Sequence, residues 1–283
     1  MSVRIIIDSS TDVNPAIESR FTVLPILIRF GEEEFVDGVT LSHQQFYRRL
    51  MTSDVLPTTS LITPSTFAEA FEAVAQAGDT AVVLTLASTL SGTYQSAVIA
   101  AQDYPGQIFV VDSMNATTGA GVLAEYALEL ADQGVPAEQI AQALTQERDR
   151  ITLVATLDTL EYLKKGGRIS SAVAFVGGML SIKPVVCLKN GEVQILAKAR
   201  GVKQGSQRMI EEIQKVGIDF SRPVLLGYTG LTDARLQSFI QDSSALWSQG
   251  GEPVHSTLVG SVVGTHVGPD AYVATFFRKE PNK

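Results

Sequence analysis

Cysteine and histidine are scarce in this chain, which has one cysteine and three histidines in 283 residues. A single cysteine cannot form an intrachain disulfide, so a disulfide scaffold is excluded. His43, His255 and His266 lack the spacing of metal ligands, and no metal site is predicted. Cys187 lies in the apolar run 185–188 and is interpreted as a small core residue rather than a nucleophile.

Basic residues are outnumbered, with 22 lysines and arginines against 30 aspartates and glutamates. The resulting net charge of -8 opposes attraction to nucleic acid and to anionic membranes, so no nucleic-acid partner is predicted. Apolar runs of membrane-spanning length are also missing, which argues against stable membrane insertion. Because the sequence passes from Met1 directly into a strand pattern without a signal segment, we expect a cytoplasmic protein.

Two phosphate-binding motifs, G-x-x-x-x-G-K-[ST] and G-x-G-x-x-G, are absent as well. Their glycine-rich backbones cradle nucleotide phosphates, so their absence argues against a nucleotide-dependent kinase. The hydrophobic fraction of 45% and the charged fraction of 18% are typical of a folded soluble protein. At 283 residues, division into two units is favoured.

The first half of the chain alternates between strand and helix patterns. Continuous apolar runs at 3–7, 81–84 and 108–111 predict buried strands, and 22–30 predicts another. Helices are expected near 14–20, 42–51, 65–78, 119–133 and 136–149. This alternation predicts a mainly parallel sheet with helices on both faces.

The second half has a different pattern. Asn190-Gly191 separates strand patterns at 182–188 and 193–199, which is a strong signal for an antiparallel hairpin. Further strands are expected near 224–228, 254–259 and 271–277, and helices near 203–216 and 233–250. We therefore predict an N-terminal domain of residues 1–157 and a C-terminal α/β domain of residues 158–283 with a mixed sheet.

Hydroxyl-rich loops follow the predicted strands of the first half. They are Asp8–Asp12, Pro57–Ser60, Thr85–Ser96 and Asp112–Gly119. Each loop alone is explained more simply by capping of the next helix. Because the carboxyl ends of parallel strands meet at one edge, the four together favour a site for an anionic group such as a carboxylate or phosphate.

Eight short motifs in order along the chain carry a resemblance to a known family. They are Asp8-Ser9-Ser10-Thr11-Asp12, Asp37-Gly38, Pro57-Thr58-Thr59-Ser60, Leu90-Ser91-Gly92-Thr93-Tyr94-Gln95-Ser96, Val111-Asp112-Ser113, Leu163-Lys164-Lys165-Gly166-Gly167-Arg168-Ile169, Ile182-Lys183-Pro184 and Gly264-Thr265-His266-Val267-Gly268-Pro269. In this order the sequence resembles the DegV family of bacterial fatty-acid-binding proteins.

The resemblance implies a two-domain α/β fold that holds one long-chain fatty acid between its domains, with no other cofactor. In that family the bound acid is presented to a separate ATP-dependent fatty-acid kinase, which makes an acyl phosphate for phospholipid metabolism. The resemblance thus implies a lipid carrier rather than an enzyme.

The family pattern also assigns roles to residues. It places the fatty-acid carboxylate on Thr59, Ser60, Ser91, Gly92 and His266. Support of phosphoryl transfer falls on Arg168 and, with a weaker match, on Arg200. The segment 172–180 and the following strand are expected to line the acyl pocket, through Phe175, Val176, Met179, Leu180 and Ile182.

Two departures from the family pattern affect these loops. Leu61-Ile62 stands where Gln and Pro commonly follow the Thr-Ser pair. Asp270 stands where a Gly-Pro-Gly pattern is common, and it brings a negative charge close to His266.

Structural explanations remain open for several of these residues. Arg168 follows a helix that ends in glycines, where a cation complements the helix dipole. A hydrogen bond to backbone would account for His266, and 172–180 reads equally as a plain buried helix. A lipid-active serine hydrolase using Ser91 and His266 is the alternative function, although Thr89–Thr93 lacks the glycines of a nucleophile elbow.

Overall fold

A parallel sheet of four strands in the order β2-β1-β6-β7 forms the centre of the N-terminal domain. The computed structural model describes residues 2–170, 182–251 and 253–280. The four strands are β1 (Val3–Asp8), β2 (Thr22–Leu24), β6 (Thr80–Thr85) and β7 (Ile108–Asp112). The predicted parallel sheet is therefore confirmed.

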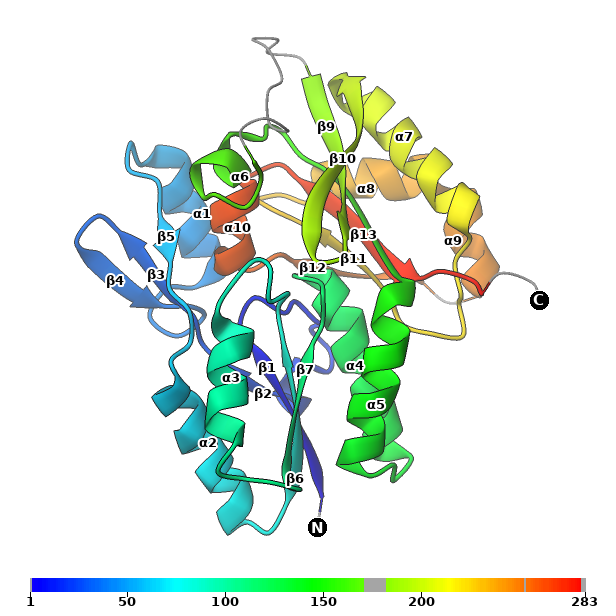
Figure 1. The fold of residues 1–283 in the computed structure, drawn as a ribbon. Helices are drawn as coiled ribbons and strands as arrows, with labels where there is room; N and C mark the ends of the chain where they lie inside the picture. Colours follow the sequence, from blue (N-terminus) through cyan, green and yellow to red (C-terminus); the bar gives the residue numbers. More distant parts are fainter. Residues whose placement is uncertain (1, 171–181, 252, 281–283) are drawn as a thin grey trace.

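Helices cover both faces of this sheet (Figure 1). Ile6 and Val83 pack with α2 (Pro64–Gln76) and α3 (Thr93–Ala101) on one face. The alternate residues Ile5 and Ile7 pack with α4 (Thr118–Asp132) and α5 (Ala137–Glu147) on the other. Because successive side chains of a strand point to opposite faces, the apolar runs of this sheet serve both layers.

The segment between β2 and α2 forms a small antiparallel sheet and a helix. The sheet contains β3 (Leu27–Phe30), β4 (Glu33–Val36) and β5 (Thr58–Thr59). Helix α1 (His43–Thr52) begins with a capping box between Ser42 and Gln45.

Two expectations for the region before α1 are wrong. The predicted helix at 14–20 is only a 3-10 turn, η1 (Glu18–Arg20), because the Asn14 side chain accepts from the amide of Ala16 and forms a turn instead. The single strand predicted at 22–30 is interrupted at Pro25, which cannot donate to a ladder. As a result β2 joins the large sheet and β3 joins the small one.

The C-terminal domain is built on a six-stranded mixed sheet in the order β10-β9-β8-β13-β11-β12. The strands are β8 (Ile151–Thr156), β9 (Ile182–Lys189), β10 (Glu192–Arg200), β11 (Val224–Tyr228), β12 (His255–Leu258) and β13 (Tyr272–Phe277). β11 and β12 are parallel, and the other neighbouring pairs are antiparallel, including the β9–β10 hairpin predicted at Asn190-Gly191. Because β8 belongs to this sheet, the chain passes from the four-stranded sheet to the six-stranded sheet before Ile151. The expected boundary, after residue 157, lies later in the chain.

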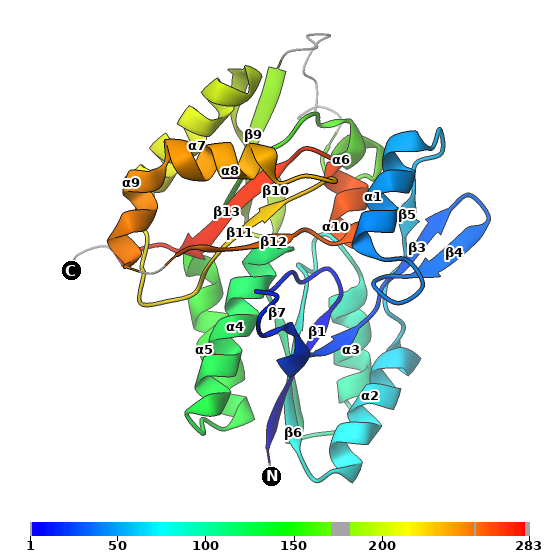
Figure 2. The same cartoon turned by 180° about the vertical axis from the view of Figure 1, so that it is seen from behind.

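The two faces of the C-terminal sheet have different neighbours. Helices α7 (Gly201–Val216), α8 (Ala234–Asp242) and α9 (Ser244–Trp247) cover the outer face (Figure 2). The inner face looks toward the N-terminal domain and the short helices α6 (Glu161–Lys165) and α10 (Ser261–Val267). Two 3-10 turns, η2 (Arg148–Arg150) and η3 (Ser248–Gly250), complete the elements.

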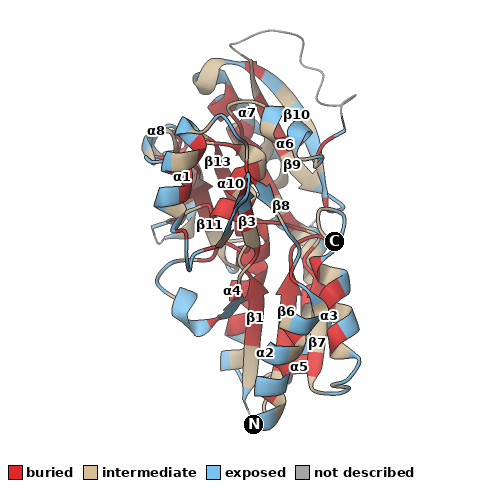
Figure 3. Ribbon diagram, turned by 90° about the vertical axis from the view of Figure 1, so that its left-hand side faces the viewer, coloured by how far each residue is buried: buried red, intermediate tan, exposed pale blue. Residues whose placement is uncertain are grey.

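Burial follows this layering: in Figure 3 much of β1, β6, β11 and β13 is red, while the outer sides of many helices are pale blue. The edge strand β10 is mostly intermediate or exposed. Helix α4 joins the two domains, because Thr118 shares a 2.6 Å hydrogen bond with Thr275 of β13. Among the described helices, none has the length and apolar character needed to cross a membrane.

Candidate ligand-binding site

A cavity of about 310 Å³ lies between the two domains and is lined mainly by apolar residues. Its polar lining residues are Thr117, Tyr228, Thr229 and Tyr272, together with a group from four segments of the chain that we call the polar end. The polar end contains Thr59, Ser60, Ser91, Gly92, Arg168 and His266. The apolar wall includes Leu86, Leu90, Leu153, Ala155, Leu157, Leu163, Val186, Leu188, Val193, Val259, Val262, Val263, Val267, Ala271 and Val273.

Strand alternation builds the apolar wall. Leu153 and Ala155 of β8, Val186 of β9 and Val273 of β13 point to the inner face of the sheet and form one cluster. The intervening residues of these strands, such as Val154, pack against the outer helices. Period-two placement thus gives the cavity a continuous hydrocarbon surface.

Thr59 and His266 meet at the polar end, where Oγ1 of Thr59 lies 3.0 Å from Nε2 of His266. Thr59 is held by the pairing of β5 with β3, opposite Ile28. His266 lies in the last turn of α10. This contact therefore brings together side chains from both domains.

Ser91 and Gly92 lie at the start of α3, on the same cavity. The hydroxyl of Ser91 accepts from the amide of Thr93 at 3.3 Å and lies 3.0 Å from the Thr93 hydroxyl. Gly92 is the N-cap and has no side chain to occupy the first-turn amides, so this end of α3 suits an anion. A Cβ at Gly92 would lie 3.0 Å from Cδ2 of Leu61. The glycine therefore leaves room for Leu61, which departs from the common family pattern.

Arg168 bridges two loops at the cavity's polar end. Its Nε donates to the carbonyl of Leu90 at 3.2 Å, and one terminal nitrogen donates to the carbonyl of Gly166 at 2.6 Å. The guanidinium is half-buried next to the Ser91 loop rather than only complementing the dipole of α6.

His266 is neutral over most of the physiological pH range. Burial lowers its pKa to about 4, and the charge of Arg168 adds to that effect. Its Nδ1 is buried and has no hydrogen-bond partner among the residues that the structure describes. A Cβ at Gly166 would clash with this nitrogen, so Gly166 allows the close approach of α6 to α10.

Not every predicted site residue reaches this cavity. Arg200 ends β10, where it is exposed and pairs with Ile182 at the start of β9, and neither residue lines the cavity. Phe175, Val176, Met179 and Leu180 lie outside the described residues. The wall provided by β8 and β13 was missed, although the alternation Leu153, Ala155, Leu157 was a signal for it.

The four hydroxyl loops divide into two kinds. Thr59, Ser91 and Thr117 line the cavity and come from three of them. The carboxylate of Asp8 instead accepts from the amides of Ser10 and Leu86. Asp112 similarly accepts from the amides of Ser88 and Met114, so these two aspartates have the structural role that capping chemistry suggests.

The serine hydrolase alternative lacks its central contact. Within the described residues, Ser91 bonds Thr93 rather than His266, and Nδ1 of His266 has no carboxylate to orient it. Across those same residues, no group of three or more histidine, cysteine or acidic side chains is placed to hold a metal ion.

Sequence comparison identifies the family of this chain. Residues 2–279 match the DegV family, whose description reads "uncharacterised protein". The chain belongs to the DegV family. This DegV family member is 32% identical to a DegV domain-containing protein of Caldanaerobacter subterraneus subsp. tengcongensis, over 98% of this chain and 99% of the relative. A DegV domain-containing protein of Deinococcus radiodurans is also 32% identical, over 96% of each chain.

Solved structures share the fold from end to end. A fatty-acid-binding DegV family protein from Thermus thermophilus is 27% identical, with a TM-score of 0.85 over 98% of this chain and 100% of that one. DegV of Bacillus subtilis, described as a fatty acid binding protein, is 26% identical, with a TM-score of 0.84 over 98% and 99%. A stearic-acid-binding protein from Eubacterium ventriosum is 25% identical, with a TM-score of 0.83 over 97% and 98%.

Proposed function

We propose that this protein binds one long-chain fatty acid in the interdomain cavity, with its carboxylate among Thr59, Ser60, Ser91, Gly92 and His266. The observation that carries the proposal is the cavity itself, which joins one polar end to an apolar wall. Proteins of the same family and fold are described as binding fatty acids, which supports this ligand class.

Burial of the hydrocarbon supplies the driving force. Transfer of about a dozen methylenes at about 0.8 kcal/mol each gives about 10 kcal/mol before the costs of association. The carboxylate needs hydrogen bonds when it leaves water, and the hydroxyls of Thr59 and Ser91 supply donors. Arg168 contributes a positive charge at the same end of the cavity.

The carboxylate end lies near the surface, which suits a carrier. Ser60 and Gly92 are exposed, and Leu61 is 45% exposed, whereas Leu153 and Val186 of the wall are only 5% exposed. We propose that the protein presents the carboxylate to a separate ATP-dependent fatty-acid kinase in the cytoplasm. Arg168 would support phosphoryl transfer, and the acyl phosphate would serve phospholipid metabolism.

Native mass spectrometry of the purified protein, followed by lipid extraction, tests the ligand. We expect a mass increment of one fatty acid per chain and recovery of that acid from the extract. Recovery of a different ligand class, or failure of the stripped protein to take up added oleate or palmitate, would overturn the proposal.

A further inference from the structure

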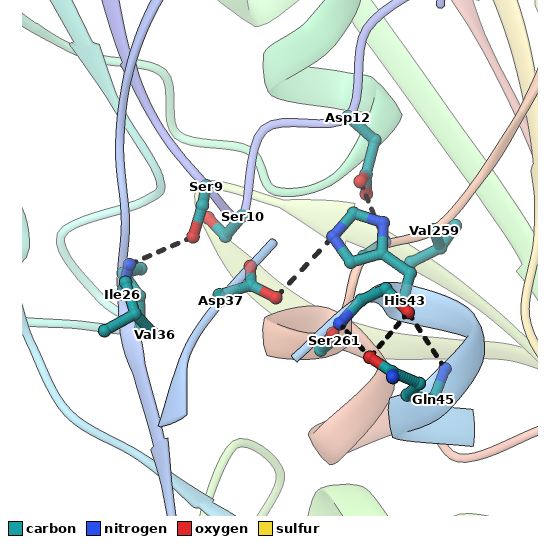
Figure 4. Close-up of polar contacts among 12 residues, drawn as sticks. Ser9, Ser10, Asp12, Ile26, Val36, Asp37, His43, Gln45, Val259 and Ser261 are labelled. Carbon is teal, nitrogen blue, oxygen red and sulfur yellow. Dashed lines mark hydrogen bonds and ion pairs between the residues drawn. The ribbon is translucent and has the colours of Figure 1, made fainter. Parts of the chain in front are cut away.

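A second cavity, of about 380 Å³, lies in the N-terminal domain and against β12, apart from the acyl cavity. The two cavities have no lining residue in common. Its wall comes from the end of β1 and the loop that follows it, from β2 and Pro25, from the loop before α1 and the start of that helix, and from β12. Figure 4 shows Ser9, Asp12, Asp37 and His43 of this wall. Its lining residues are Ile7, Ser9, Thr11, Asp12, Val13, Pro15, Glu18, Val23, Pro25, Asp37, Gly38, Val39, His43, Thr257 and Leu258.

The charged groups in this wall are mainly acidic. Asp12, Glu18 and Asp37 face a single ionisable base, His43, and the described lining contains no lysine or arginine. Burial by itself lowers the pKa of His43, but the close contact with the Asp37 carboxylate, together with the charges of Asp12 and Glu18, raises it overall. Burial also raises the pKa of Asp12 to about 7, so this carboxyl is partly protonated at neutral pH. Even then, and with a protonated His43, Glu18 and Asp37 leave the wall with an excess of negative charge.

Asp37 is the most unusual of these groups. Its residue is only 2% exposed, and neither carboxylate oxygen has a hydrogen-bond partner within the described chain. Its closest charged neighbour is Nε2 of His43, 3.5 Å from Oδ1. Figure 4 shows the His43 ring between Asp37 and Asp12. A buried carboxylate without hydrogen bonds is costly, so Asp37 calls for a donor.

Thr11 gives an independent indication of a missing hydrogen-bond partner. It is 6% exposed and lines the same cavity, and its hydroxyl oxygen is buried without a partner among the described residues. Asp12 is different, since its carboxylate already accepts from the hydroxyl of Thr117 at 2.6 Å and the amide of Gly260 at 2.8 Å. The groups without a partner are therefore the Thr11 hydroxyl, which can accept or donate, and the Asp37 carboxylate, which accepts.

The rim of the cavity is apolar. Val39 is 73% exposed and Val23 is 40% exposed, and Pro15 and Pro25 also belong to the lining. Exposed valines above a polar floor provide contact for a hydrocarbon stem that carries a polar head.

We propose that this second cavity binds a primary ammonium group on a short aliphatic stem. An ammonium has three donors and no acceptor, which matches a floor of unmet acceptors. Its charge offsets the acidic excess, and its stem lies on Val23 and Val39. Because the Asp37 side chain is wholly buried behind His43, whose side chain is 31% exposed, the proposal requires the His43 ring to move aside for the ammonium. A free alkylamine and the lysine side chain of a partner protein share this chemistry.

Calorimetric titration with butylammonium chloride at pH 7.5 tests the site. We expect saturable binding of one butylammonium per chain. Sodium chloride tests ionic strength, 1-butanol tests the stem without charge, and tetramethylammonium tests charge without N–H donors. None of these three should bind saturably. Equal binding of 1-butanol or tetramethylammonium, or no saturable binding of butylammonium, would overturn the proposal.

Substitutions in the second cavity test where butylammonium binds. Asp37→Asn removes one charge with little change of shape and should weaken butylammonium binding about tenfold or more. Thr11→Val removes the second acceptor and should weaken binding several-fold, which keeps the test sharp if Asp37→Asn does not fold. Asp103→Asn, an exposed residue outside this cavity, is the matched control and should bind like the wild type. Unchanged affinity in a folded Asp37 variant and in the Thr11 variant would remove the site.

A second titration distinguishes the two sources of the ammonium. Nα-acetyl-lysine methylamide carries the same head on a peptide unit. Binding of both probes supports a lysine side chain as ligand, whereas binding of butylammonium alone supports a free amine. Because neither Asp37 nor Thr11 lines the acyl cavity, a negative result here leaves fatty-acid binding intact.

Discussion

Oγ1 of Thr59 lies 3.0 Å from Nε2 of His266, although 207 positions separate the two residues. Because burial and Arg168 keep His266 neutral, its ring carries one N–H. With that proton on Nε2, Thr59 accepts from the ring, and its own hydroxyl hydrogen is free to donate to a carboxylate. The contact thus links the approach of the two domains to the proposed carboxylate site.

Thr59→Val and Ser91→Ala should each weaken fatty-acid binding by about tenfold to a hundredfold. A hydrogen bond to a charged group contributes about 1.5 to 3 kcal/mol. Displacement of a fluorescent fatty acid from the stripped protein measures the effect. Thr58→Val, at the exposed neighbour of Thr59 in β5, is the control and should bind normally. Wild-type affinity in both site variants would exclude these hydroxyls from the site.

Arg168→Gln should reduce acyl-phosphate formation in a reconstituted assay with a fatty-acid kinase more than it reduces fatty-acid binding. The substitution removes the positive charge next to the Ser91 loop, where negative charge builds up during transfer. The exposed Lys165, which pairs loosely with Glu161, provides the control Lys165→Gln. A kinase rate for Arg168→Gln equal to that of the control would contradict the assigned role.

Ala155→Phe should shorten the longest acyl chain that the cavity accepts. Ala155 lies on β8 at the inner face, 6% exposed, and its methyl group is part of the cavity wall. A phenyl ring there fills space that is otherwise available to ligand. Affinities for octanoate and palmitate, compared in wild type and variant, report the change. Equal losses for both acids, or none for palmitate, would argue against this wall as the tail site.

Glu125 should make the protein less stable as the pH rises toward neutrality. Burial raises its pKa from 4.5 to about 7, with a small opposing effect from the amide of Asn14, which donates to it at 2.7 Å. The folded state therefore binds this proton more tightly than the unfolded state, and stability falls between about pH 4.5 and pH 7. Above about pH 7 this carboxyl lowers the free energy of unfolding by about 3 kcal/mol relative to its value below about pH 4.5.

Glu125→Gln keeps the carbonyl acceptor for Asn14 and has no charge to bury, so its stability should fall less over the same pH interval. Urea unfolding at pH 5 and pH 7.5 measures the difference. Glu69→Gln, at an exposed position of α2, should retain the wild-type pH dependence. Parallel pH profiles for wild type and Glu125→Gln would show that this carboxyl is not the source.

The sequence predicted which segments form strands better than it predicted which sheet each strand joins. The apolar runs at β1, β6 and β7 define a parallel sheet because their patterns are local. The same pattern in β8 does not say which sheet the strand joins, since that depends on its distant partner β13. Pro25 is a local signal that interrupts a strand, and the prediction of one strand over 22–30 did not take it into account.

For the polar end of the interdomain cavity, the sequence likewise predicted some features and not others. Thr59, Ser91 and His266 were assigned through ordered motifs, and all three line the same cavity. Arg200 was not brought to it, because the hairpin directs the end of β10 toward α7. The sequence did not predict the second cavity, because His43 lacks the spacing of a metal ligand and Asp37 is 25 residues from Asp12 along the chain, so no local spacing indicates that these residues lie close together.

The gradient of burial along the acyl cavity sets the direction in which a ligand loads. Ser60 and Leu61, which line its hydroxyl-bearing end, are exposed, whereas Val259, elsewhere in the lining, is only 2% exposed. An amphiphile that enters there goes in methyl-first, and the anion never crosses the hydrocarbon interior, where its desolvation would be most costly. Under the proposed function, the charged group is therefore the last part of the ligand to leave water on binding and the first to regain it on release.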